Sequence, residues 1–416
     1  MKIFQINTVA NSGSTGRITE GIGQEIINKG WESYIAYGRY ANPSSSHLIK
    51  IGNKIDHYFH AFLTRLTDKH GLGSKYYTNK LIREIKKIDP DIIHLHNIHG
   101  YYINLQILFN YLRKSNKPVV WTLHDCWSFT GHCSHYEYVN CQKWQTMCHD
   151  CPQKLEYPKS FFDNSKNNFL AKKKLFTSLD NLNLVPVSSW LKGELEKSFL
   201  MKYPIQIINN GIDLDCFNYV ESDLRESLKL SNKFVILGVA STWDDMKGIN
   251  VFVELSKLLD ENFKIVLIGL NQKQINKLPK DIIAKPRTES SKELVEYYSM
   301  ADVFLNPTLQ DTFPTTNIEA QACGTFVITF RSGGAPETIA YKTGIVVEKH
   351  NMNSLIKEIK QLRINGSKVN ARFSRENAEK NYNKIIKFKE YIALYEKIIK
   401  SYDNLAVKLT FLLNSY

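Results

Sequence analysis

Short apolar runs alternate along this chain with longer segments of helical period. The runs predict buried strands, and the segments with apolar residues at three- to four-residue spacing predict helices packed on them. In the first half the predicted strands comprise residues 2–9, 31–37, 91–96, 119–125 and 182–187; in the second they comprise 234–240, 263–269, 302–306 and 326–330. Short strands with helices between them predict parallel sheets covered on both faces.

The alternation stops near residues 204–210 and then restarts, which predicts two Rossmann-like domains. A length of 416 residues also exceeds what one hydrophobic core usually serves. We expect a first domain over 1–203, a second over 204–385, and a helix over 386–416 that returns to the first domain. Ligands of such sheets bind at the carboxyl ends of the strands, so the crevice between the domains is the predicted site.

The charge balance predicts an anionic partner. The chain has 54 Lys and Arg against 41 Asp and Glu, a net charge of +13. Such a surface favours a nucleotide, a lipid phosphate, an acidic leaflet or nucleic acid, although a Lys-rich solvated surface is the alternative. No apolar run approaches the roughly 20 residues that span a bilayer, and the start is not typical of a signal peptide. We therefore expect a cytoplasmic protein. The stretch LAVKLTFLL (405–413) predicts a short packing helix or one that touches a membrane.

A polar turn opens one predicted helix in the second half. The segment DTFPTTNIEAQACG (311–324) follows a strand, and its helix begins at Thr315, Thr316 and Asn317. A helix amino terminus has unpaired N–H groups and a positive dipole end, so it favours an anion.

Two carboxylates flank this turn. Asp311 lies in the loop before the helix, and Glu319 lies one turn inside it. A carboxylate in that position can accept hydrogen bonds from both hydroxyls of a ribose. An ordinary N-capping turn, with Asp311 as a solvated loop charge, is the alternative interpretation.

Two further loops after strands have the composition of phosphate contacts. The segment GVASTWDDMKG (238–248) ends with Lys247 and Gly248 at the start of a helix, where a lysine can reach a diphosphate. Near the amino terminus, NSGSTGR (11–17) is a Gly-rich turn between a strand and a helix. It does not match the dinucleotide pattern G-x-G-x-x-G.

Taken together, these segments resemble the retaining nucleotide-sugar glycosyltransferases of the GT-B fold, in the large family numbered four. The resemblance spans nearly the whole chain. Within that family, HDCWSFTGHC (124–133) is similar to enzymes of capsule, colanic-acid-like and O-antigen assembly. The matching segments are SGSTGRI (12–18), TLHD (122–125), VPVSSW (185–190), NNGID (209–213), the Lys247–Gly248 turn and the carboxylate-x7-carboxylate segment.

The resemblance implies an α/β architecture of two Rossmann-like domains facing across a cleft. It also implies a role for each matched residue. Glu319 would bind the ribose and Asp311 the donor sugar. The backbone of Thr315, Thr316 and Asn317 would hold phosphate, and Lys247, beside Gly248, would pair with the diphosphate. Thr15, Gly16 and Arg17 would approach the pyrophosphate or the acceptor from the first domain, and His124 would lie beside the reacting carbon.

Two positions depart from the family pattern. Asp311 stands where a glutamate is usual, and its side chain is shorter. An arginine is usual about six residues before the lysine, and here that position is Ser241. Arg17 or Arg331 is the predicted substitute; otherwise donor binding is weaker.

Transfer of a sugar from a nucleotide requires stabilisation of a diphosphate that gains negative charge. Lys247 and the helix amino terminus can do this without a metal, so we expect no catalytic cofactor. In a retaining reaction a leaving phosphate oxygen can take the acceptor proton, so His124 is predicted to position or polarise, with Asp125 orienting it. A structural strand-end histidine is the alternative. His94, His96 and His99 are predicted to be structural, with contact to the acceptor as the alternative.

Five cysteines fall within one predicted insertion, residues 126–158, and four of them are candidate metal ligands. Four thiolates can hold a structural zinc ion in a closed tetrahedral site; a disulfide, free thiols or an iron–sulfur cluster are the alternatives. Cys126, Cys216 and Cys323 are expected to be buried small residues. The candidate ligands are Cys133, Cys141, Cys148 and Cys151.

The pattern as a whole predicts a retaining glycosyltransferase, peripheral on the inner membrane face. It would use a UDP- or GDP-linked sugar and a lipid-linked glycan acceptor, and would not bind nucleic acid. Two alternatives stay open. A nucleotide-sugar epimerase of the same fold would release nucleotide without an acceptor. A nucleic-acid-binding protein would show clustered arginines with exposed aromatics, whereas lysines dominate here and are dispersed.

Overall fold

A computed structural model describes residues 1–366 and 370–413, with side chains as far as residue 402. The chain forms two compact units. The first comprises Met1–Asn209 and the chain from Ile385 onward, and the second comprises Asn210–Lys384. The sequence analysis placed these boundaries at 203/204 and 385/386.

The first unit is built on a parallel six-stranded sheet in the order β3-β2-β1-β4-β5-β6. Its central strands are almost entirely buried and mostly apolar, as strands covered on both faces require. The strand β3 escaped prediction because it is a short, largely exposed edge strand. The strands are β1 (Lys2–Asn7), β2 (Glu32–Tyr37), β3 (His47–Lys50), β4 (Ile92–Leu95), β5 (Val119–Leu123) and β6 (Leu182–Pro186).

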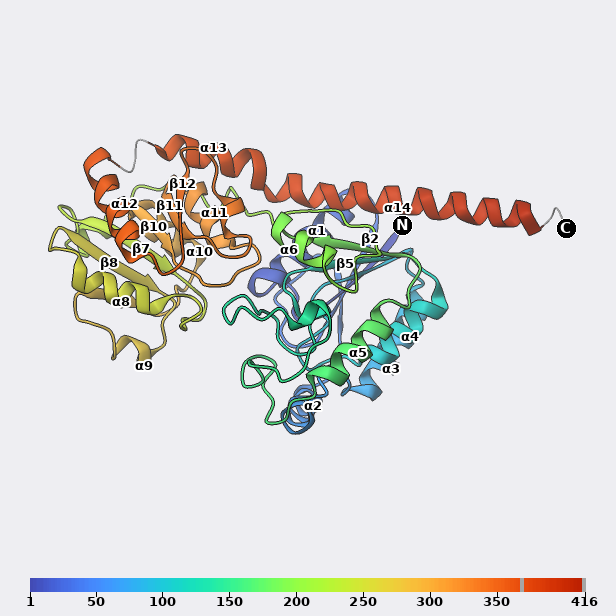
Figure 1. Ribbon diagram of the computed structural model, residues 1–416. Coiled ribbons are helices and arrows are strands. Elements are labelled where there is room, and N and C mark those ends of the chain that lie inside the picture. The colour runs from blue at the N-terminus through green and yellow to red at the C-terminus, as the bar shows by residue number, and fades with distance from the viewer. Residues whose placement is uncertain (367–369, 414–416) are drawn as a thin grey trace. The chain divides into compact units, whose positions relative to one another are not determined.

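Helices cover this sheet and connect its strands (Figure 1). The amphipathic spacing of their apolar residues places one face of most of them against the sheet. They are α1 (Gly13–Asn28), α2 (Lys54–Thr67), α3 (Lys75–Ile88), α4 (Leu105–Ser115), α5 (Ser165–Phe176) and α6 (Ser189–Glu196).

The last helix, α14 (Lys384–Leu413), packs on the first unit, as predicted for the end of the chain (Figure 1). Tyr395 of α14 is fully buried, and its hydroxyl lies 2.6 Å from Nδ1 of His94 in β4. At the surface, Lys29 forms an ion pair with Glu396 at 2.9 Å. The predicted packing or membrane role of residues 405–413 falls outside the side chains that the structure describes.

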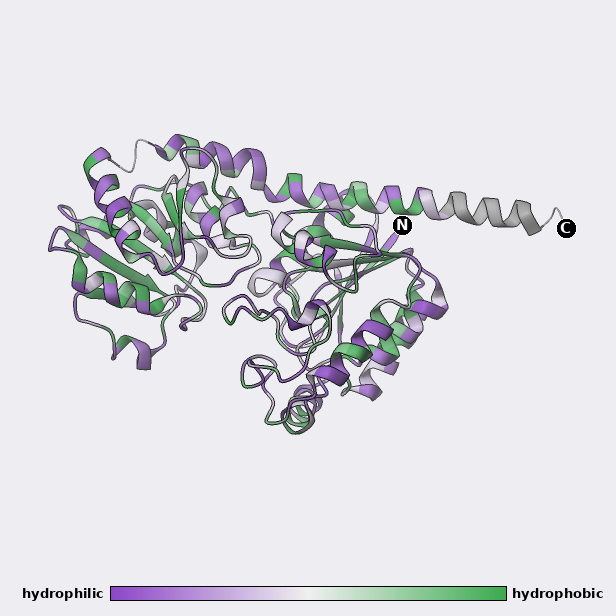
Figure 2. Cartoon of the chain, in the orientation of Figure 1, coloured by the Kyte–Doolittle hydropathy of each residue, from purple (hydrophilic) through white to green (hydrophobic). Residues whose placement is uncertain are grey.

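The second unit has the same architecture, with a parallel sheet in the order β12-β11-β10-β7-β8-β9. Its inner strands bury nearly every residue. Figure 2 shows these strands mostly green, the colour of hydrophobic residues. The edge strands β9 and β12 are four residues long and only partly buried, which explains why they carried little signal. The strands are β7 (Phe234–Val239), β8 (Phe263–Ile268), β9 (Ile282–Lys285), β10 (Val303–Asn306), β11 (Phe326–Phe330) and β12 (Gly344–Val347).

The helices of the second unit pack on both faces of its sheet (Figure 1). Phe252 and Leu255 of α8 are fully buried against β7 and β8, and Leu355 and Ile359 of α12 belong to the same apolar core. The helices are α7 (Leu224–Ser227), α8 (Ile249–Leu258), α9 (Gln272–Ile275), α10 (Ser291–Met300), α11 (Thr315–Ala322), α12 (Met352–Asn365) and α13 (Ala371–Tyr382), with the 3-10 helix η3 (Ala335–Thr338).

The cysteine-rich insertion connects β5 to α5 and is mostly irregular. It contains two 3-10 helices, η1 (Trp127–Phe129) and η2 (Lys143–Gln145). Lys172 of α5 is buried beneath it and donates hydrogen bonds to the carbonyls of Trp127 (2.7 Å) and Thr130 (3.1 Å). Burial lowers the pKa of Lys172 to about 7. The insertion is therefore anchored to the sheet domain by a buried side chain as well as by apolar packing.

Among the helices whose residues are described, none combines the length and the apolar character needed to cross a bilayer.

Candidate functional site

In each sheet the first strand has its successors on one side and the later strands on the other, so the strand order reverses there. The loops that follow the two strands at this switch point diverge and leave a crevice between them. In the second unit this switch point lies between β7 and β10. The loop after β7 carries Lys247, and the loop after β10 carries Asp311. The fold thus brings the two predicted donor-binding loops side by side.

The ammonium group of Lys247 and the carboxylate of Asp311 form an ion pair between these loops. Nζ of Lys247 lies 2.7 Å from Oδ2 of Asp311. Oδ1 of the same carboxylate accepts a hydrogen bond from the N–H of Phe313 at 3.1 Å. The cation predicted to meet a diphosphate is therefore held by the carboxylate predicted to meet the sugar.

Backbone contacts between the loops fix this arrangement. The N–H of Leu309 donates to the carbonyl of Met246 at 2.8 Å. Gly248 has φ +76°, and an added Cβ would lie 2.4 Å from the carbonyl oxygen of Pro307. Only glycine satisfies both the left-handed backbone and this close approach. Gly248 therefore sets where its neighbour Lys247 stands.

We expect Gly248→Ala to impair the site by pushing the two loops apart. The substitution should lower transfer activity tenfold or more and lower the melting temperature, because both the backbone conformation and the contact with Pro307 become strained. Activity and thermal unfolding, measured on the same preparation, test this. Gly193→Ala is the matched control: Gly193 lies within α6, and an added Cβ there meets nothing within 4 Å. It should leave activity unchanged and raise stability slightly. Equal behaviour of the two variants would contradict the prediction.

The amino terminus of α11 offers two of the three predicted phosphate contacts. Thr315 and Thr316 are half-buried, and their amides belong to the first turn, where no carbonyl of the helix can pair with them. Asn317 is fully buried; its side chain donates to Oγ1 of Thr338 at 2.9 Å, and its N–H donates to the carbonyl of Pro314 at 3.2 Å. Asn317 therefore fastens the helix, and the prediction of phosphate binding now rests on Thr315 and Thr316.

Glu319 lies one turn inside α11, as predicted, but in a buried position. It is 7% exposed, and its Oε2 accepts a hydrogen bond from the hydroxyl of Tyr298 at 3.0 Å. Burial and the Glu319 carboxylate together raise the pKa of Tyr298 well above its usual range, so the hydroxyl stays a donor. Sequence reasoning did not find Tyr298, which lies on a different helix. Ribose binding by Glu319 stays a prediction.

The two candidate sources of a further positive charge lie at the surface. Ser241 is exposed in the loop after β7. Arg331 is also exposed, and its Nε forms an ion pair with Glu348 at 2.5 Å. Arg17, in the first unit, is exposed on α1. Replacement of the missing cation by either arginine stays a prediction.

The switch point of the first unit lies between β1 and β4. Asn7, fully buried at the end of β1, donates to the carbonyl of Val9 (2.9 Å) and to Oγ1 of Thr15 (3.3 Å). Its Oδ1 accepts from the N–H of Asn97 at 3.2 Å. Gly16 is buried, and a Cβ there would press on Val9 at 3.0 Å. The predicted Gly-rich turn is thus held close to the loop that follows β4.

His124 belongs to a chain of hydrogen bonds that sets its tautomer. Nε2 of Gln5 donates to the carbonyl of Thr19 at 3.0 Å, so Oε1 of Gln5 faces Nε2 of His96, 3.1 Å away. His96 therefore carries its proton on Nε2 and accepts on Nδ1 from Nε2 of His124 at 3.2 Å. In neutral His124 the lone pair then lies on Nδ1.

Burial keeps these histidines neutral. It lowers the pKa of His124 to about 4 and that of His96 well below its usual range. Together with Asn97, His99 and Asp125, they line a small pocket at the carboxyl ends of β4 and β5. A neutral imidazole with an acceptor nitrogen can position a hydroxyl group; that role of His124 stays a prediction.

The prediction that Asp125 orients His124 needs a correction. Oδ2 of Asp125 pairs with Nε2 of His99 at 2.8 Å, and Oδ1 accepts from the N–H of Trp127 at 2.9 Å. Burial raises the pKa of Asp125, but the charge and hydrogen bond of His99 outweigh it and bring the value to about 2. The hydrogen bond that sets the His124 tautomer comes from His96 instead.

His94 is structural, as predicted. It is fully buried, with Nδ1 at the Tyr395 hydroxyl (2.6 Å) and Nε2 at Oγ1 of Thr122 (2.8 Å). Burial lowers its pKa to about 3. His94 thus connects β4 to α14 in its neutral form.

We expect this histidine to make the protein less stable in acid. The folded pKa of His94 lies below the unfolded value of about 6.5, so the unfolded chain binds more protons as the pH falls from 6.5 toward 3. Stability should therefore be full above pH 6.5 and should fall below it. In His94→Gln, the unfolding free energy should fall less steeply with decreasing pH, by the slope that corresponds to about one bound proton. Chemical denaturation at several pH values measures this slope. Exposed His47 provides the control, because His47→Gln should leave the slope unchanged. A slope unaltered in both variants would refute the prediction.

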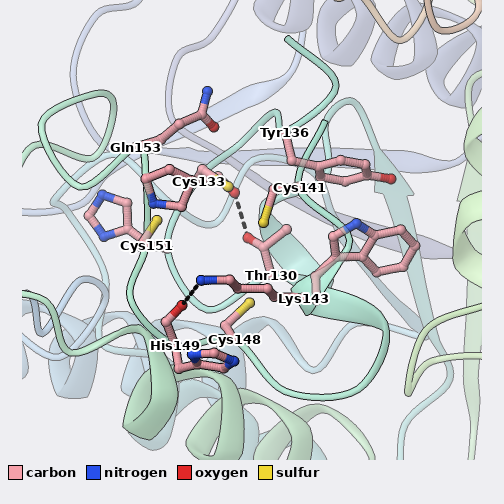
Figure 3. Close-up of a pocket in the computed structure, with 12 residues that line it drawn as sticks. Thr130, Cys133, Tyr136, Cys141, Lys143, Cys148, His149, Cys151 and Gln153 are labelled. Atoms are coloured by element: carbon pink, nitrogen blue, oxygen red, sulfur yellow. Dashed lines mark hydrogen bonds between the residues drawn. The ribbon is translucent and has the colours of Figure 1, made fainter. Parts of the chain in front are cut away.

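The four predicted zinc ligands line one small pocket in the insertion (Figure 3). Sγ of Cys148 accepts from the N–H of Gly131 at 3.1 Å, and the thiol of Cys133 is hydrogen-bonded to Cys151. All seven cysteines are free thiols. Cys126 and Cys323 are buried, as expected, whereas Cys216 is only half-buried. Within the described part of the chain, no three His, Cys, Asp or Glu side chains are already spaced to hold one metal ion. Zinc binding stays a prediction.

Comparison with known proteins identifies two glycosyltransferase domains in the chain. Residues 15–216 match the Glycosyltransferase Family 4 domain, and residues 220–381 match the group 1 glycosyl transferases. The chain is a GT-B glycosyltransferase. The enzyme is 26% identical over 372 residues to WcaC of Escherichia coli (strain K12), assigned as a colanic acid biosynthesis glycosyl transferase; the match covers 86% of this chain and 89% of WcaC.

A second relative acts on a lipid-linked glycan. The enzyme is 27% identical over 208 residues to the N,N'-diacetylbacillosaminyl-diphospho-undecaprenol alpha-1,3-N-acetylgalactosaminyltransferase of Campylobacter jejuni, covering 46% of this chain and 54% of that one.

Solved structures confirm the predicted fold class. A glycosyltransferase from Rickettsia africae superposes with a TM-score of 0.67 at 19% identity, over 96% of this chain and 98% of that one. Anabaena Alr3699/HepE in complex with UDP-glucose superposes with a TM-score of 0.65 at 13% identity, over 95% and 100%.

Proposed function

We propose that the enzyme transfers one sugar, with retention, from a UDP- or GDP-linked donor to a polyprenyl-diphosphate-linked glycan in surface polysaccharide assembly. The observation that carries this proposal is the Lys247–Asp311 ion pair at the switch point of the second unit. The relatives support the acceptor class, since one of them is named for a diphospho-undecaprenol substrate. A structural neighbour that holds UDP-glucose supports the donor class.

The proposed chemistry assigns one role to each of the predicted residues. As the bond between the anomeric carbon and the diphosphate oxygen breaks, Lys247 and the amides of Thr315 and Thr316 stabilise the negative charge on the leaving group. The acceptor hydroxyl forms the new bond on the same face of the sugar, and its proton passes to an oxygen of the departing diphosphate. His124, neutral at physiological pH, positions that hydroxyl through Nδ1. Glu319 holds the ribose.

The decisive experiment measures nucleotide release from a panel of UDP- and GDP-linked sugars, with and without a polyprenyl-diphosphate-linked glycan. We expect release from one donor that depends on the acceptor, and a product whose anomeric configuration, determined by NMR, matches that of the donor. Rapid release without any acceptor would favour the epimerase. Inverted product would overturn retention, and a salt-dependent gel shift with no turnover would favour nucleic-acid binding.

We further propose that the enzyme works at the acidic inner face of the cytoplasmic membrane. A lipid-linked acceptor has its reactive glycan at the bilayer surface, and a net charge of +13 attracts the chain to anionic lipids.

A further inference from the structure

Helix α2 carries its apolar residues on the side that faces away from the protein. Ile55 and Tyr58 are 78% and 75% exposed, Phe59 and Phe62 are 58% and 57% exposed, and Leu66 is 40% exposed. At 100° per residue, these five positions fall within an arc of about 100°, which is the width of a typical buried helix face. Here that face is covered by nothing in the described chain.

The opposite, polar face of α2 is held firmly against the protein. Nε2 of buried His60 accepts hydrogen bonds from the N–H groups of Gly71 and Gly73, both at 3.2 Å. Oγ of Ser74 lies 3.0 Å from Nδ1 of His60 and donates to Asp56 at 2.6 Å. These contacts fix the rotation of the helix, so α2 cannot turn its apolar face inward without losing buried hydrogen bonds.

A second exposed apolar segment lies at the end of α2. The N–H of Phe161 donates to the carbonyl of Arg65 at 2.9 Å, which places this loop beside the last turn of the helix. Phe161 and Phe162 are 60% and 63% exposed. The apolar stripe of α2 and these two phenylalanines, hereafter the α2 surface, form a contiguous patch; several such residues together are unusual on a monomeric soluble protein.

The border of the α2 surface carries more basic than acidic side chains. Lys54, Arg65 and Lys69 are exposed on or next to the helix, and Lys159 and Lys166 are exposed around the phenylalanine loop, against the exposed carboxylates of Glu156 and Asp163. Aromatic and aliphatic side chains with a basic border have the composition of a helix that lies in the interface of an anionic bilayer. A groove for a protein partner would need no such charge, and a second copy of this basic surface would repel the first.

We propose that the α2 surface docks on an anionic lipid bilayer, with the apolar side chains inserted at the level of the head groups. This deepens the proposed function, because it names the part of the first unit that meets the membrane carrying the lipid-linked acceptor.

The test is binding of the full chain to vesicles of phosphatidylcholine with and without phosphatidylglycerol. The triple variant Tyr58→Ser, Phe59→Ser, Phe62→Ser should bind anionic vesicles at least tenfold more weakly than the unaltered chain, and salt should weaken binding of both. The matched control is Tyr341→Ser with Ile364→Ser, which removes side chains that are 84% and 83% exposed elsewhere. It should bind normally.

Two results would overturn the proposal: unaltered vesicle binding by the triple variant, or a concentration-dependent dimer that the triple variant abolishes while vesicles are not bound. Transfer to a short-chain, water-soluble acceptor separates this proposal from the proposed function. The triple variant should retain that activity. If no acceptor is glycosylated, the proposed function fails. The vesicle measurements still test membrane binding by the α2 surface independently.

An independent observation concerns the cysteine pocket of Figure 3. Buried His132 lines the pocket, and Nδ1 lies 2.6 Å from Oδ1 of buried Asp68. Neutral His132 then has its proton on Nδ1 and its lone pair on Nε2. Nε2 is buried and has no hydrogen-bond partner among the described residues. A carboxylate that holds the far nitrogen of an imidazole is the usual support of a metal-binding histidine.

Two sulfur atoms of the pocket accept hydrogen bonds from the backbone, which is a support expected of metal ligands. The N–H of Gly131 donates to Cys148, and that of Gln153 donates to Cys151. The space between the lining residues measures about 10 Å³, which suits one ion and is far too small for a sugar. Because the side chains are not yet spaced to hold an ion, the thiols would have to rotate inward.

The geometry points to a structural zinc site formed by His132, Cys133, Cys148 and Cys151. Three thiolates and one imidazole are a common tetrahedral set for structural zinc. The cysteine spacing alone gave the fourth position to Cys141, which lines the same pocket. We assign it to His132 because Asp68 holds Nδ1 of this imidazole and its buried Nε2 has no hydrogen-bond partner among the described residues.

Elemental analysis of the purified full chain tests this site. We expect about one zinc per chain, and at least a fivefold loss in His132→Gln and in Cys151→Ser. Cys141→Ser and the distant Cys216→Ser should keep the metal. The cobalt(II)-substituted protein should show the absorption of tetrahedral thiolate ligation. Loss of zinc in Cys141→Ser but not in His132→Gln would overturn the assignment of His132. A folded, zinc-free chain whose melting temperature does not rise with added zinc would overturn the site itself.

Discussion

Replacing Glu319 with alanine should lower the rate of sugar transfer at least a hundredfold, about 3 kcal/mol of transition-state stabilisation. The proposed role of this carboxylate is to accept both ribose hydroxyls, and its buried position makes that contact strong because water competes little there. The measurement is kcat/KM for the donor, with thermal unfolding of the same preparation to show that the variant is folded.

Two further variants separate binding from structure. Glu319→Ala also leaves the buried hydroxyl of Tyr298 without its acceptor, which costs stability of about 1–3 kcal/mol by itself. Tyr298→Phe removes that hydrogen bond but keeps the carboxylate, so it should retain most of the activity. Glu319→Gln keeps the shape of the side chain and one acceptor oxygen. Its activity should lie between that of Glu319→Ala and that of Tyr298→Phe. Near-normal turnover in folded Glu319→Ala would show that Glu319 is not part of the site. If Tyr298→Phe loses as much activity as Glu319→Ala, the role of Glu319 is structural.

Much of the fold could be predicted because strands buried on both faces leave a direct signal. Each of the central strands is a short run of apolar residues, and prolines mark where two of them begin. The edge strands β3, β9 and β12 are only four residues long and partly exposed, so their apolar runs are too short to give a clear signal.

The sequence allowed candidate site residues to be named, but not the partners of their side chains. The loops with Lys247 and Asp311 follow strands and have the composition of phosphate contacts, yet nothing local says that the two side chains meet. The same holds for Tyr298 with Glu319, for Asp125 with His99, and for Tyr395 with His94. Each pairing depends on the strand order, which brings together residues far apart in the chain.

Helix α2 shows a different limit. Its apolar residues have the spacing that is typical of a helix face buried in a core. The structure exposes them because hydrogen bonds of His60 and Ser74 hold the polar face inward. Periodicity identifies the two faces of a helix but cannot tell which one meets the protein when the polar face has fixed partners.

Replacing Lys247 with methionine should have the largest effect on the enzyme, a loss of roughly 10²–10³ in kcat. Methionine keeps much of the apolar length of the side chain and removes the charge that faces the leaving diphosphate. Because the ion pair with Asp311 already orders the ammonium group, the wild-type lysine needs little rearrangement when negative charge develops. The loss should therefore appear mainly in kcat, measured under donor saturation.

The partner variants decide how the pair works. Asp311→Asn keeps the size of the side chain but releases Lys247, so it should lower kcat less than Lys247→Met. If Asp311 also binds the sugar, the donor KM should rise as well. Lys247→Arg should rescue only in part, because a planar guanidinium cannot reproduce a compact ammonium group in the same gap between the loops. The missing arginine at Ser241 makes this lysine the main positive charge that we assign to the leaving group, so full activity in folded Lys247→Met would leave the proposed mechanism without its electrostatic basis.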